Sequence, residues 1–395
     1  MRILHVIDYF QPKLGYQETF LPKEHAKLGH EVHVVTSERY NPIVYSGNAT
    51  KLILGKRILG AGFFIEEGIK VWRLKTLFEL PHAIWMRGLD SKIQELKPDI
   101  VIMHGIINFS AIRIAKLKKK LGNFKLICDD HMAFGASRSR LRILYPLFKW
   151  TFSHLIQEAA DALVGVADTS KMFMHKTYGI PLERITVIPL GADDELFRFD
   201  EAIRQEIRKQ LSVNEDDIVF IYAGKIVPVK GPHLLVEAAL KLMNGYGKLK
   251  VILLGNGAES YIEGIKQAIN AQYLKDRFIW HDAVPNKELH KFYSAANVAV
   301  WPREASLSMM EAMACNLPII ISDSSEITER VGHDNGLTYH EGDVSDLAGQ
   351  MERLLDPELR RKMGQNGRKF VEEGLSWKII ARQFIEIVSS EKEAT

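Results

Sequence analysis

The sequence predicts an α/β protein made of two doubly wound domains with parallel sheets. Three observations lead to this fold class. Short apolar runs alternate with helical patterns of about 10–15 residues, and the alternation occurs in two successive series. The length of 395 residues also exceeds what one ordinary core holds. With 26% charged and 46% apolar residues, the composition is that of an ordinary globular enzyme.

The first domain is predicted to comprise residues 1–195. Its opening run, RILHVID, alternates small apolar side chains and lacks the apolar core and cleavage pattern of a signal peptide, so we interpret it as a strand. The later runs are short and β-rich, and helical patterns separate them. The predicted strands of this domain are residues 2–8, 31–37, 69–74, 99–105, 124–130, 161–166 and 186–191.

The second domain is predicted to comprise residues 196–375. Its predicted strands are residues 217–224, 250–255, 277–282, 297–302 and 318–323. A last helix over residues 376–390 is expected to pack on the first domain through an apolar stripe of Trp377, Ile380, Phe384 and Ile387. In doubly wound domains ligands bind at the carboxyl ends of the strands, and the two sets of ends are expected to face each other across a cleft.

Composition also narrows the function classes. No stretch of 18 apolar residues occurs, so no membrane-spanning helix is expected. Cys128 and Cys315 lie in apolar segments, which indicates a reducing compartment, the cytoplasm. Residues 1–195 carry 27 Lys and Arg against 20 Asp and Glu, which would suit an anionic surface or acceptor, although ordinary scatter explains it equally well. Nucleic acid is a poor partner because no recognition motif accompanies the charge.

Two segments carry the most chemical information, YAGKIVPVKG at 222–231 and WPREASLSMMEAMA at 301–314. The first places Lys225 and Lys230 in a turn between Gly224 and Gly231, and the second places Glu311 in the first part of a helix. A diphosphate requires cations and free backbone N–H groups, and a ribose requires an acceptor for its hydroxyls. Together the segments predict a nucleotide-sugar site.

The same segments resemble those of retaining glycosyltransferases of family 4. YAGKIVPVKG resembles the family's G-R-x-x-x-x-K-G segment, and EAMACNLPIII resembles its E-A-M-A-C-G-x-P-V-I segment. Further segments match in the same order: the run from Gln11 to Thr36, VIPLGADDELFRF at 187–199 and VILLGNG at 251–257. The resemblance implies the GT-B fold, with two Rossmann-like domains and the donor in the cleft, and transfer with retention of configuration.

The resemblance also implies roles for residues of the second domain. Lys225, where the family usually has Arg, and Lys230 would stabilise the leaving diphosphate, and Gly224 would let the backbone approach it. Glu311 would accept hydrogen bonds from the ribose. The alternatives are two solvated lysines and a surface glutamate. Other predicted donor-binding residues are Gly255, Val284 beside Ala283, and the small-residue run Ala305, Ser306, Leu307 and Ser308.

Two loops depart from the family pattern. The family has a second Glu eight positions before Glu311, where this chain has Arg303, so Glu304, one residue closer, becomes the candidate for the sugar contact. Ser306 stands where glycine is common. In the first loop only Gly15 remains of the family's paired glycines, which contact the donor phosphate or acceptor, and an ordinary turn glycine is the alternative.

His131 follows the predicted strand 124–130, where many relatives have a His that contacts the sugar or supports the transition state. Asp129 and Asp130 would orient His131 or accept a proton from the acceptor, and a turn that caps the strand is the alternative. No spacing of His, Cys, Asp and Glu resembles a metal site, so neither a metal nor another cofactor is expected.

The expected function is retaining transfer from a nucleotide-diphosphate sugar, a UDP-sugar ahead of GDP- or ADP-sugars. The expected acceptor is a glycan or lipid-linked precursor of a cell-surface polysaccharide or glycoconjugate. Residues 137–152 combine cationic and aromatic side chains, as expected for a segment that contacts the inner face of the cytoplasmic membrane. Packing of the apolar members in the core explains the segment equally well. A nucleotide-sugar-binding protein without transferase activity and a nucleotide-sugar epimerase are the alternatives.

Overall fold

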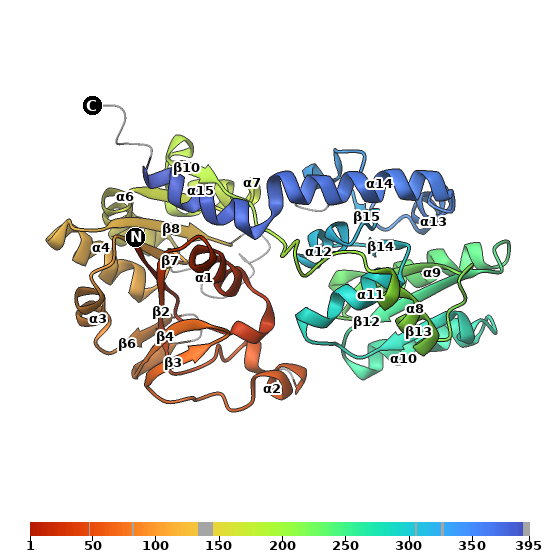
Figure 1. Cartoon of the computed structure of the whole chain (residues 1–395), viewed down its shortest axis with the longest axis horizontal. Coiled ribbons are helices and arrows are strands. Elements are labelled where there is room, and N and C mark those ends of the chain that lie inside the picture. The colour runs from red at the N-terminus through yellow and green to blue at the C-terminus, as the bar shows by residue number, and fades with distance from the viewer. Residues whose placement is uncertain (47, 81–82, 133–144, 305, 325–327, 390–395) are drawn as a thin grey trace. The chain divides into compact units, whose positions relative to one another are not determined.

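The computed structural model describes the chain except residues 47, 81–82, 133–144, 305, 325–327 and 390–395. The chain forms two compact units, Met1–Leu190 with Trp377–Thr395 and Gly191–Ser376 (Figure 1). The backbone N–H of Ala192 donates to the carbonyl of Leu375 at 2.8 Å, which ties this segment to the second unit. The division falls between residues 190 and 191, whereas the sequence placed it between 195 and 196.

The described part of the first unit contains a sheet of eight strands and a separate hairpin. The strands are β1 (Arg2–Val6), β2 (Glu31–Ser37), β3 (Gly62–Glu66), β4 (Ile69–Leu74), β5 (Thr76–Leu80), β6 (Ala83–Met86), β7 (Ile100–His104), β8 (Lys125–Asp130), β9 (Ala162–Gly165) and β10 (Ile185–Val187). The order in the sheet is β10-β9-β8-β7-β1-β2-β4-β3, and β5 pairs with β6. Every pair in the large sheet is parallel except β3 with β4.

Each of the seven runs predicted in this unit overlaps a strand, whereas β3, β5 and β6 were not predicted. β3 is an edge strand whose side chains are exposed or half-buried, so it lacks a buried apolar run. It turns back onto β4 through Glu67 and Gly68, which both have positive φ. β10 ends at Val187, before the predicted 191, because Pro189 has no N–H to continue the ladder.

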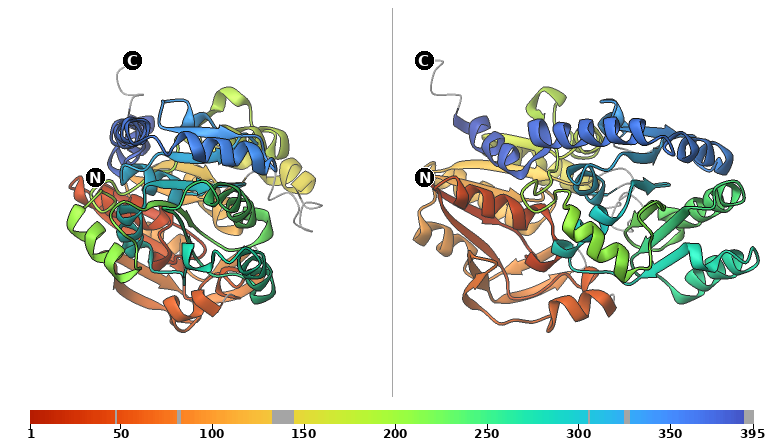
Figure 2. Two further views of the ribbon diagram at one scale, coloured as in Figure 1. Left: turned by 90° about the vertical axis from the view of Figure 1, so that its right-hand side faces the viewer. Right: turned by 45° about the vertical axis from the view of Figure 1, so that its right-hand side comes forward.

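Helices cover both faces of this sheet. The helices of the unit are α1 (Gln17–Lys27), α2 (Asn48–Leu54), α3 (Leu89–Leu96), α4 (Phe109–Leu121), α5 (Tyr145–Phe148), α6 (His154–Ala159), α7 (Asp168–Phe173) and α15 (Trp377–Ser389). α3, α4 and α6 pack on the face that carries Val6, Met103 and Cys128. α1 and α15 lie side by side (Figures 1 and 2) and contact β1 and β8 respectively.

α15 joins the first unit through an apolar stripe that differs by one residue from the prediction. Trp377, Ile380, Phe384 and Val388 are buried, whereas the predicted Ile387 is only half-buried. The helical period explains the difference, since Val388 lies one turn after Phe384 on the same face. Trp377 also stacks on Phe20 of α1, with ring centroids 5.5 Å apart.

The described part of the second unit is a parallel sheet of six strands with helices around it. The strands are β11 (Ile218–Ala223), β12 (Leu249–Leu254), β13 (Phe278–His281), β14 (Val298–Trp301), β15 (Ile319–Ser322) and β16 (Gly336–Tyr339), in the order β13-β12-β11-β14-β15-β16. The helices are α8 (Glu201–Gln210), α9 (Pro232–Met243), α10 (Glu259–Asn270), α11 (Leu289–Ala295), α12 (Ser308–Ala314), α13 (Val344–Arg353) and α14 (Pro357–Phe370). The short strand β16 was not predicted.

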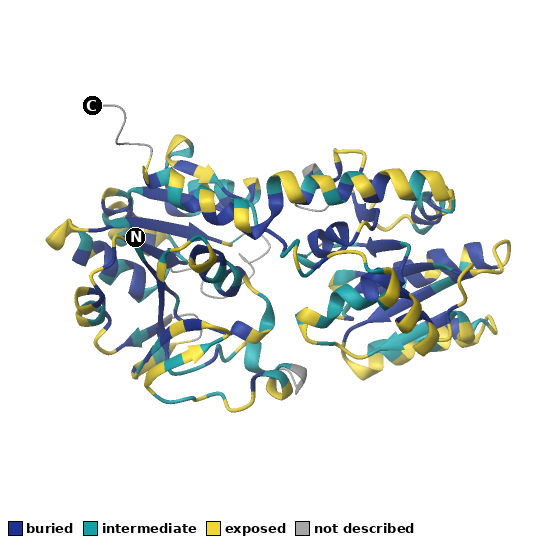
Figure 3. Cartoon of the chain, viewed as in Figure 1, coloured by how far each residue is buried: buried dark blue, intermediate teal, exposed yellow. Residues whose placement is uncertain are grey.

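Both sheets have buried central strands, coloured dark blue in Figure 3, because their apolar runs are covered on both faces. The predicted fold class, two doubly wound α/β domains, is confirmed. The strand order reverses between β1 and β7 in the first sheet and between β11 and β14 in the second. Loops that follow the strands on either side of such a reversal leave the sheet in opposite directions, and ligands bind there.

Candidate functional site

The turn after β11 is built backbone against backbone on the turn after β12. The N–H of Gly224 donates to the carbonyl of Leu254, and the N–H of Ile226 to that of Asn256, both at 3.0 Å. A Cβ at Gly255 would lie 1.8 Å from the carbonyl oxygen of Gly224, so no larger residue fits without a backbone shift. This close approach explains the glycine of the β12 turn, and a donor-binding role for Gly255 stays a prediction.

The cationic turn itself, residues 224–231, carries the predicted lysines between β11 and α9. Lys225 is exposed, and its backbone carbonyl accepts a 2.7 Å hydrogen bond from the hydroxyl of Tyr222. Lys230 ends a short 3-10 turn, and Gly231 follows with φ of 71°, a left-handed conformation that suits glycine. The sequence therefore folds here into a rigid, glycine-bounded turn that holds two cations at the carboxyl end of a central strand.

The loop after β14 contacts the cationic turn. Nζ of Lys230 lies 3.2 Å from Oε2 of Glu304 and donates to the carbonyl of Glu304 at 3.3 Å. Nη1 of Arg303 donates to the carbonyl of Pro228 at 3.1 Å. The structure thus brings Glu304 and Lys230 together, as two predicted site residues, and adds Arg303 as a third cation. In the sequence Arg303 stands out only as a departure from the family pattern, although its place two residues after a central strand was an available signal.

Glu311 lies in the first turn of α12 and is buried, with 4% of its surface exposed. Its Oε1 accepts a 2.7 Å hydrogen bond from Nδ2 of Asn286. Burial raises the pKa of Glu311 to about 7, the bond from Asn286 opposes the rise, and the charge of Asp193 adds to it. Asn286, which the sequence analysis missed, holds the carboxylate in one orientation. The alternative of an exposed surface glutamate at this position is wrong.

The other predicted donor-binding residues of the second unit lie around these two loops. Oγ of Ser308 donates to the carbonyl of Ala223 at 3.3 Å and lies 2.6 Å from Oγ of Ser306. Leu307 precedes α12, and Val284 is half-buried in the segment after β13. Ala305 lies outside the described residues. The serines therefore tie the β14 loop to the end of β11, and their contact with a donor stays a prediction.

In the first unit, Gly15 ends the 3-10 turn Pro12–Leu14 just before α1. Its φ is 72°, so the backbone requires the left-handed conformation there. This geometry accounts for the glycine as a turn residue, and its contact with donor or acceptor stays a prediction.

His131 follows β8 and is about one third exposed. Its Nε2 lies 3.8 Å from Oδ1 of Asp129, which is fully buried. Asp130 is 1% exposed, and burial raises its pKa to about 6. An acceptor hydroxyl cannot reach a side chain as buried as Asp129, so of the two predicted roles the geometry favours orientation of His131.

Asp129 is also bonded to His104, which the sequence analysis did not select. Nδ1 of His104 lies 2.7 Å from Oδ2 of Asp129. Together with His131 they bring three potential ligand atoms within 4.8 Å of one another. Both ring nitrogens of His104 are engaged, however, because Nε2 lies 3.1 Å from Nδ1 of His5. His5, His104 and Asp129 thus form a hydrogen-bonded network beside His131.

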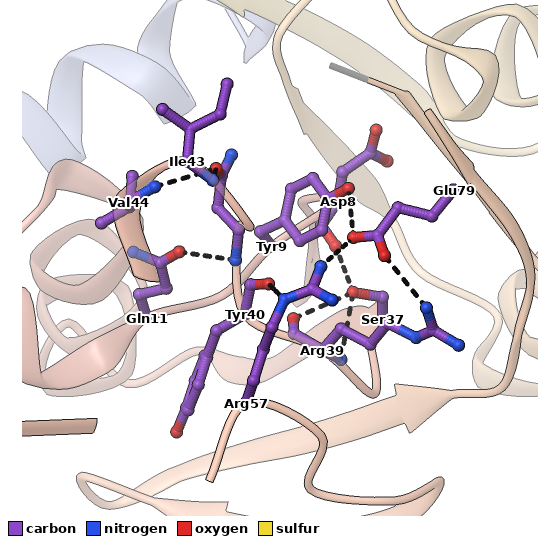
Figure 4. Close-up of polar contacts among 11 residues, drawn as sticks. Asp8, Tyr9, Gln11, Ser37, Arg39, Tyr40, Ile43, Val44, Arg57 and Glu79 are labelled. Carbon is purple, nitrogen blue, oxygen red and sulfur yellow. Dashed lines mark hydrogen bonds and ion pairs between the residues drawn. The ribbon is translucent and has the colours of Figure 1, made fainter. Parts of the chain in front are cut away.

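A second polar group lies where β1 and β2 end, and Figure 4 shows it around Glu79 of β5. The carboxylate of Glu79 accepts from the hydroxyl of Tyr9 and from Nη1 of Arg39, both at 3.0 Å, and from Arg57. Nearby, Asp8 is buried and accepts a 2.6 Å bond from Oγ of Ser110, and burial raises its pKa to about 7. This group was not predicted from the sequence, because Glu79 and Arg57 lie far along the chain from the ends of β1 and β2.

Family comparisons identify the chain. Residues 203–370 match the family model described as glycosyl transferases group 1, and residues 21–196 match the model described as glycosyltransferase family 4. The chain belongs to glycosyltransferase family 4. Each of the two matches falls largely on one unit of this family 4 chain, so the predicted resemblance is confirmed over most of its length.

Individual relatives of this family 4 chain are distant. It is 29% identical over 216 residues to a D-inositol 3-phosphate glycosyltransferase of Acidothermus cellulolyticus, and 27% identical over 236 residues to an alpha-D-kanosaminyltransferase of Streptomyces kanamyceticus. These matches cover 52% and 57% of this chain and 48% and 59% of the relatives, so the chain spans about half the length of the curated relatives it matches.

A solved structure shows the same fold over nearly the whole chain. The crystal structure of Anabaena Alr3699/HepE in complex with UDP aligns with a TM-score of 0.74, covering 99% of this chain and 100% of that one, at 18% identity. At this identity the likeness concerns the fold, which is GT-B. Among the described residues of this family 4 chain, no helix combines the length and apolar character needed to span a bilayer.

Proposed function

We propose that this chain is an active retaining glycosyltransferase that moves a sugar from a nucleotide-diphosphate donor to an acceptor hydroxyl. One observation carries the proposal. Lys225, Lys230 and Arg303 gather around the turn after β11, at the strand-order reversal of the second sheet. The buried carboxylate of Glu311 lies on α12, the helix that follows the loop after β14. Crystal structures of HepE with UDP and with UDP-glucose support a donor whose nucleotide is UDP.

The proposed chemistry follows from the charges. A diphosphate leaving group gathers negative charge as its bond to the sugar breaks, and fixed cations lower the barrier by stabilising that charge. Lys225 and Lys230 serve this purpose, and Arg303 offers a forked guanidinium that suits phosphate oxygens. The carboxylate of Glu311 accepts hydrogen bonds from the ribose. His131, which lies beside Asp129, supports the oxocarbenium-like sugar while the acceptor attacks from the face that the nucleotide leaves.

A donor-binding experiment tests the proposal. Melting temperatures of the wild-type chain, Lys230→Ala and the control Lys266→Ala are measured with UDP-, GDP- and ADP-glucose. Lys266 is a surface residue of the same unit, paired with Glu263 on α10. We expect a rise with the UDP-sugar in wild type and control, and its loss in Lys230→Ala, because a ligand stabilises the folded state that binds it.

Two outcomes would contradict the proposal. A rise that persists in Lys230→Ala would remove the cationic turn from the donor site, and no rise with any donor would favour a protein that has lost donor binding. Proton NMR of the product anomer then tests retention, and a product that keeps its nucleotide would indicate an epimerase.

The proposed acceptor is a glycan or lipid-linked precursor presented at a membrane surface. Of the segment 137–152, Arg138, Arg140, Arg142 and Leu144 lie outside the described residues. In the described part, Trp150 is 90% and Leu147 58% exposed beside the exposed Lys149, whereas Phe148 is buried against Tyr178. Core packing therefore explains Phe148 but not Leu147 and Trp150, and an exposed Trp beside a cation is typical of residues that contact lipid interfaces.

Vesicle co-sedimentation tests the membrane contact. Vesicles of phosphatidylcholine with and without phosphatidylglycerol are mixed with the wild-type chain, Leu147→Ala/Trp150→Ala and the control Tyr273→Ala, whose aromatic side chain is 96% exposed in the second unit. We expect binding to anionic vesicles that the double substitution weakens and the control keeps. Equal binding by all three proteins would contradict the proposal.

A further inference from the structure

Three histidines and one aspartate form an unbroken chain of hydrogen bonds inside the first unit. His25 on α1, His5 on β1, His104 on β7 and Asp129 on β8 are each 5% exposed or less. His104 and Asp129 are register partners, and His5 pairs with the residue two before His104, so the side chains share the face that α1 and α15 cover. This histidine chain begins at the backbone of α15 and ends beside His131.

The contacts of the histidine chain are all short. Nε2 of His25 lies 2.9 Å from the carbonyl oxygen of Ala381 on α15. Nδ1 of His25 lies 3.1 Å from Nε2 of His5. Nδ1 of His5 lies 3.1 Å from Nε2 of His104, and Nδ1 of His104 lies 2.7 Å from Oδ2 of Asp129.

The carbonyl at one end fixes the direction of these bonds. Because the carbonyl of Ala381 can only accept, Nε2 of His25 carries a hydrogen, and Nδ1 of the neutral ring accepts. Nε2 of His5 must then donate to His25, and Nδ1 of His5 must accept from Nε2 of His104. Burial favours neutral rings for His5 and His25, and in neutral rings these directions place the hydrogen of each on Nε2.

The carboxylate at the other end requires a further hydrogen. Besides the contact with His104, Oδ2 of Asp129 accepts from Nε2 of Gln17 at 3.1 Å, and Oδ1 accepts from the N–H of Gly105 at 3.3 Å. These donors favour the ionised carboxylate, so Nδ1 of His104 donates as well. The four bonds need four ring hydrogens and three neutral rings supply three, so one of the three rings is an imidazolium. His104 is the ring that lies 2.7 Å from the carboxylate, and this contact places the positive charge on His104.

We infer that His5, His25 and His104 are positioning residues, which hold one excess proton as an ion pair of His104 with Asp129 and so fix Asp129 as the ionised partner of His131. This role in sugar transfer rests on the proposed function, in which His131 supports the reacting sugar. Because His104 balances the charge of Asp129, Asp129 orients His131 without taking a proton from His131. α15 takes part through the carbonyl of Ala381, which sets the direction of the whole histidine chain.

The electrostatic surroundings agree with this assignment. Burial lowers the pKa of His5 strongly and that of His25 to about 4, so both rings are neutral. Burial alone would lower the pKa of His104, but the charge of Asp129 raises it above its usual value. Burial would likewise raise the pKa of Asp129, but the charge of His104 lowers it. Other titratable groups near the histidine chain are Glu18 of α1, His30 after α1, and Asp130 and His131 at the end of β8.

NMR of the full-length chain with 15N-labelled histidine tests the protonation pattern at pH 8, above the usual histidine pKa of about 6.5. Single His→Gln variants assign the signals. We expect both nitrogens of His104 protonated, and His5 and His25 neutral with hydrogen on Nε2. A neutral His104 would overturn the inference, since the excess proton would then lie on Asp129 or on another histidine. A pattern that appears only after Zn²⁺ is added and vanishes with chelator would overturn it in favour of a metal site.

Kinetics test the positioning role with variants matched for burial. His5→Leu interrupts the histidine chain, His5→Gln restores one donor and one acceptor, and His33→Gln is the control, because His33 is 5% exposed in the same sheet and bonded to Trp72 instead. We expect kcat of His5→Leu to fall at least about tenfold with the donor KM unchanged, as for a misplaced reacting group, with partial rescue in His5→Gln. A loss matched by His33→Gln, or a change in KM alone, would overturn the positioning role.

The two readouts separate this inference from the proposed function. Donor binding lost in Lys230→Ala supports the function whatever the NMR pattern is. If the wild-type chain binds no donor and transfers no sugar, the positioning role falls with the function, even where the NMR pattern of the histidine chain is as expected. If His5→Leu does not fold, the wild-type spectrum still decides the protonation state.

Discussion

Replacing Glu311 by Gln is expected to stabilise the free protein while weakening its affinity for the donor. The carboxylate is 4% exposed, and burial raises its pKa from the usual 4.5 to about 7. Because the folded-state pKa is the higher one, the folded protein binds the proton more tightly than the unfolded chain between these two values. Stability contributed by the neutral form is therefore present at low pH and is lost as the pH rises through about 7.

The magnitude follows from the two pKa values. At about 1.4 kcal/mol per pH unit, the difference between 4.5 and about 7 corresponds to about 3 kcal/mol at pH 8.5, where the folded state must hold a buried charge. Gln has nearly the same shape and carries no charge, so Glu311→Gln avoids this cost. For a unit of this size, about 3 kcal/mol shifts the melting temperature by roughly 6–12 °C. At pH 5 the advantage falls to about 1 kcal/mol.

Calorimetry of the full-length chain at pH 5 and pH 8.5 measures this difference. The control is Glu304→Gln, since the side chain of Glu304 is 59% exposed in the same unit and should show no such pH dependence. Isothermal titration with the UDP-sugar at pH 8.5 should show about tenfold to hundredfold weaker binding by Glu311→Gln, because a charge-assisted bond to the ribose becomes a neutral one. A variant that gains no stability at pH 8.5, or gains equally at both pH values, would refute the reasoning.

Two further predictions concern the turns beside Glu311. Arg303→Ala should weaken binding of the UDP-sugar on the order of tenfold in isothermal titration, because it removes a cation and the bond to the carbonyl of Pro228 in the cationic turn. An unchanged Kd would exclude Arg303 from the site. Gly255→Ala should cost about 3 kcal/mol in urea denaturation, because its Cβ would meet the carbonyl of Gly224, whereas the control Gly264→Ala on α10, with open space around it, should be neutral or stabilising. Equal stabilities of these two glycine variants would show that the two turns do not pack closely in solution.

The sequence could predict most of the fold because buried strands have a strong local signature. Runs such as those of β1 and β11 are mostly apolar, since helices cover both faces, and each is found where it was predicted. β3 and β16 escaped prediction because their short runs do not differ from loop sequence until a neighbouring strand pairs with them. Strand propensity depends on that context more than helix propensity does.

The candidate site was predictable in part for the same reason. Lys225, Lys230 and Glu311 occur in contiguous motifs with their own glycines and helix start, so their chemistry is visible in the sequence. Asn286 and Arg303 become meaningful only through the tertiary contacts that join them to Glu311 and to the cationic turn. His5 and His104 gave one signal that went unused, a polar residue inside each of two apolar strand runs.

The sequence by itself determined the alternation of strands and helices, the family, and the chemical groups offered to a diphosphate and a ribose, because these depend on residues close together in the chain. Only the tertiary structure decided how those groups are charged. Glu311 and Asp129 are both carboxylates, yet burial raises the pKa of the first and the charge of His104 lowers that of the second. The physical reason is that a pKa depends on solvent and on neighbouring charges, and the packed strands and helices bring those neighbours from positions as distant as residues 5, 25, 104 and 381.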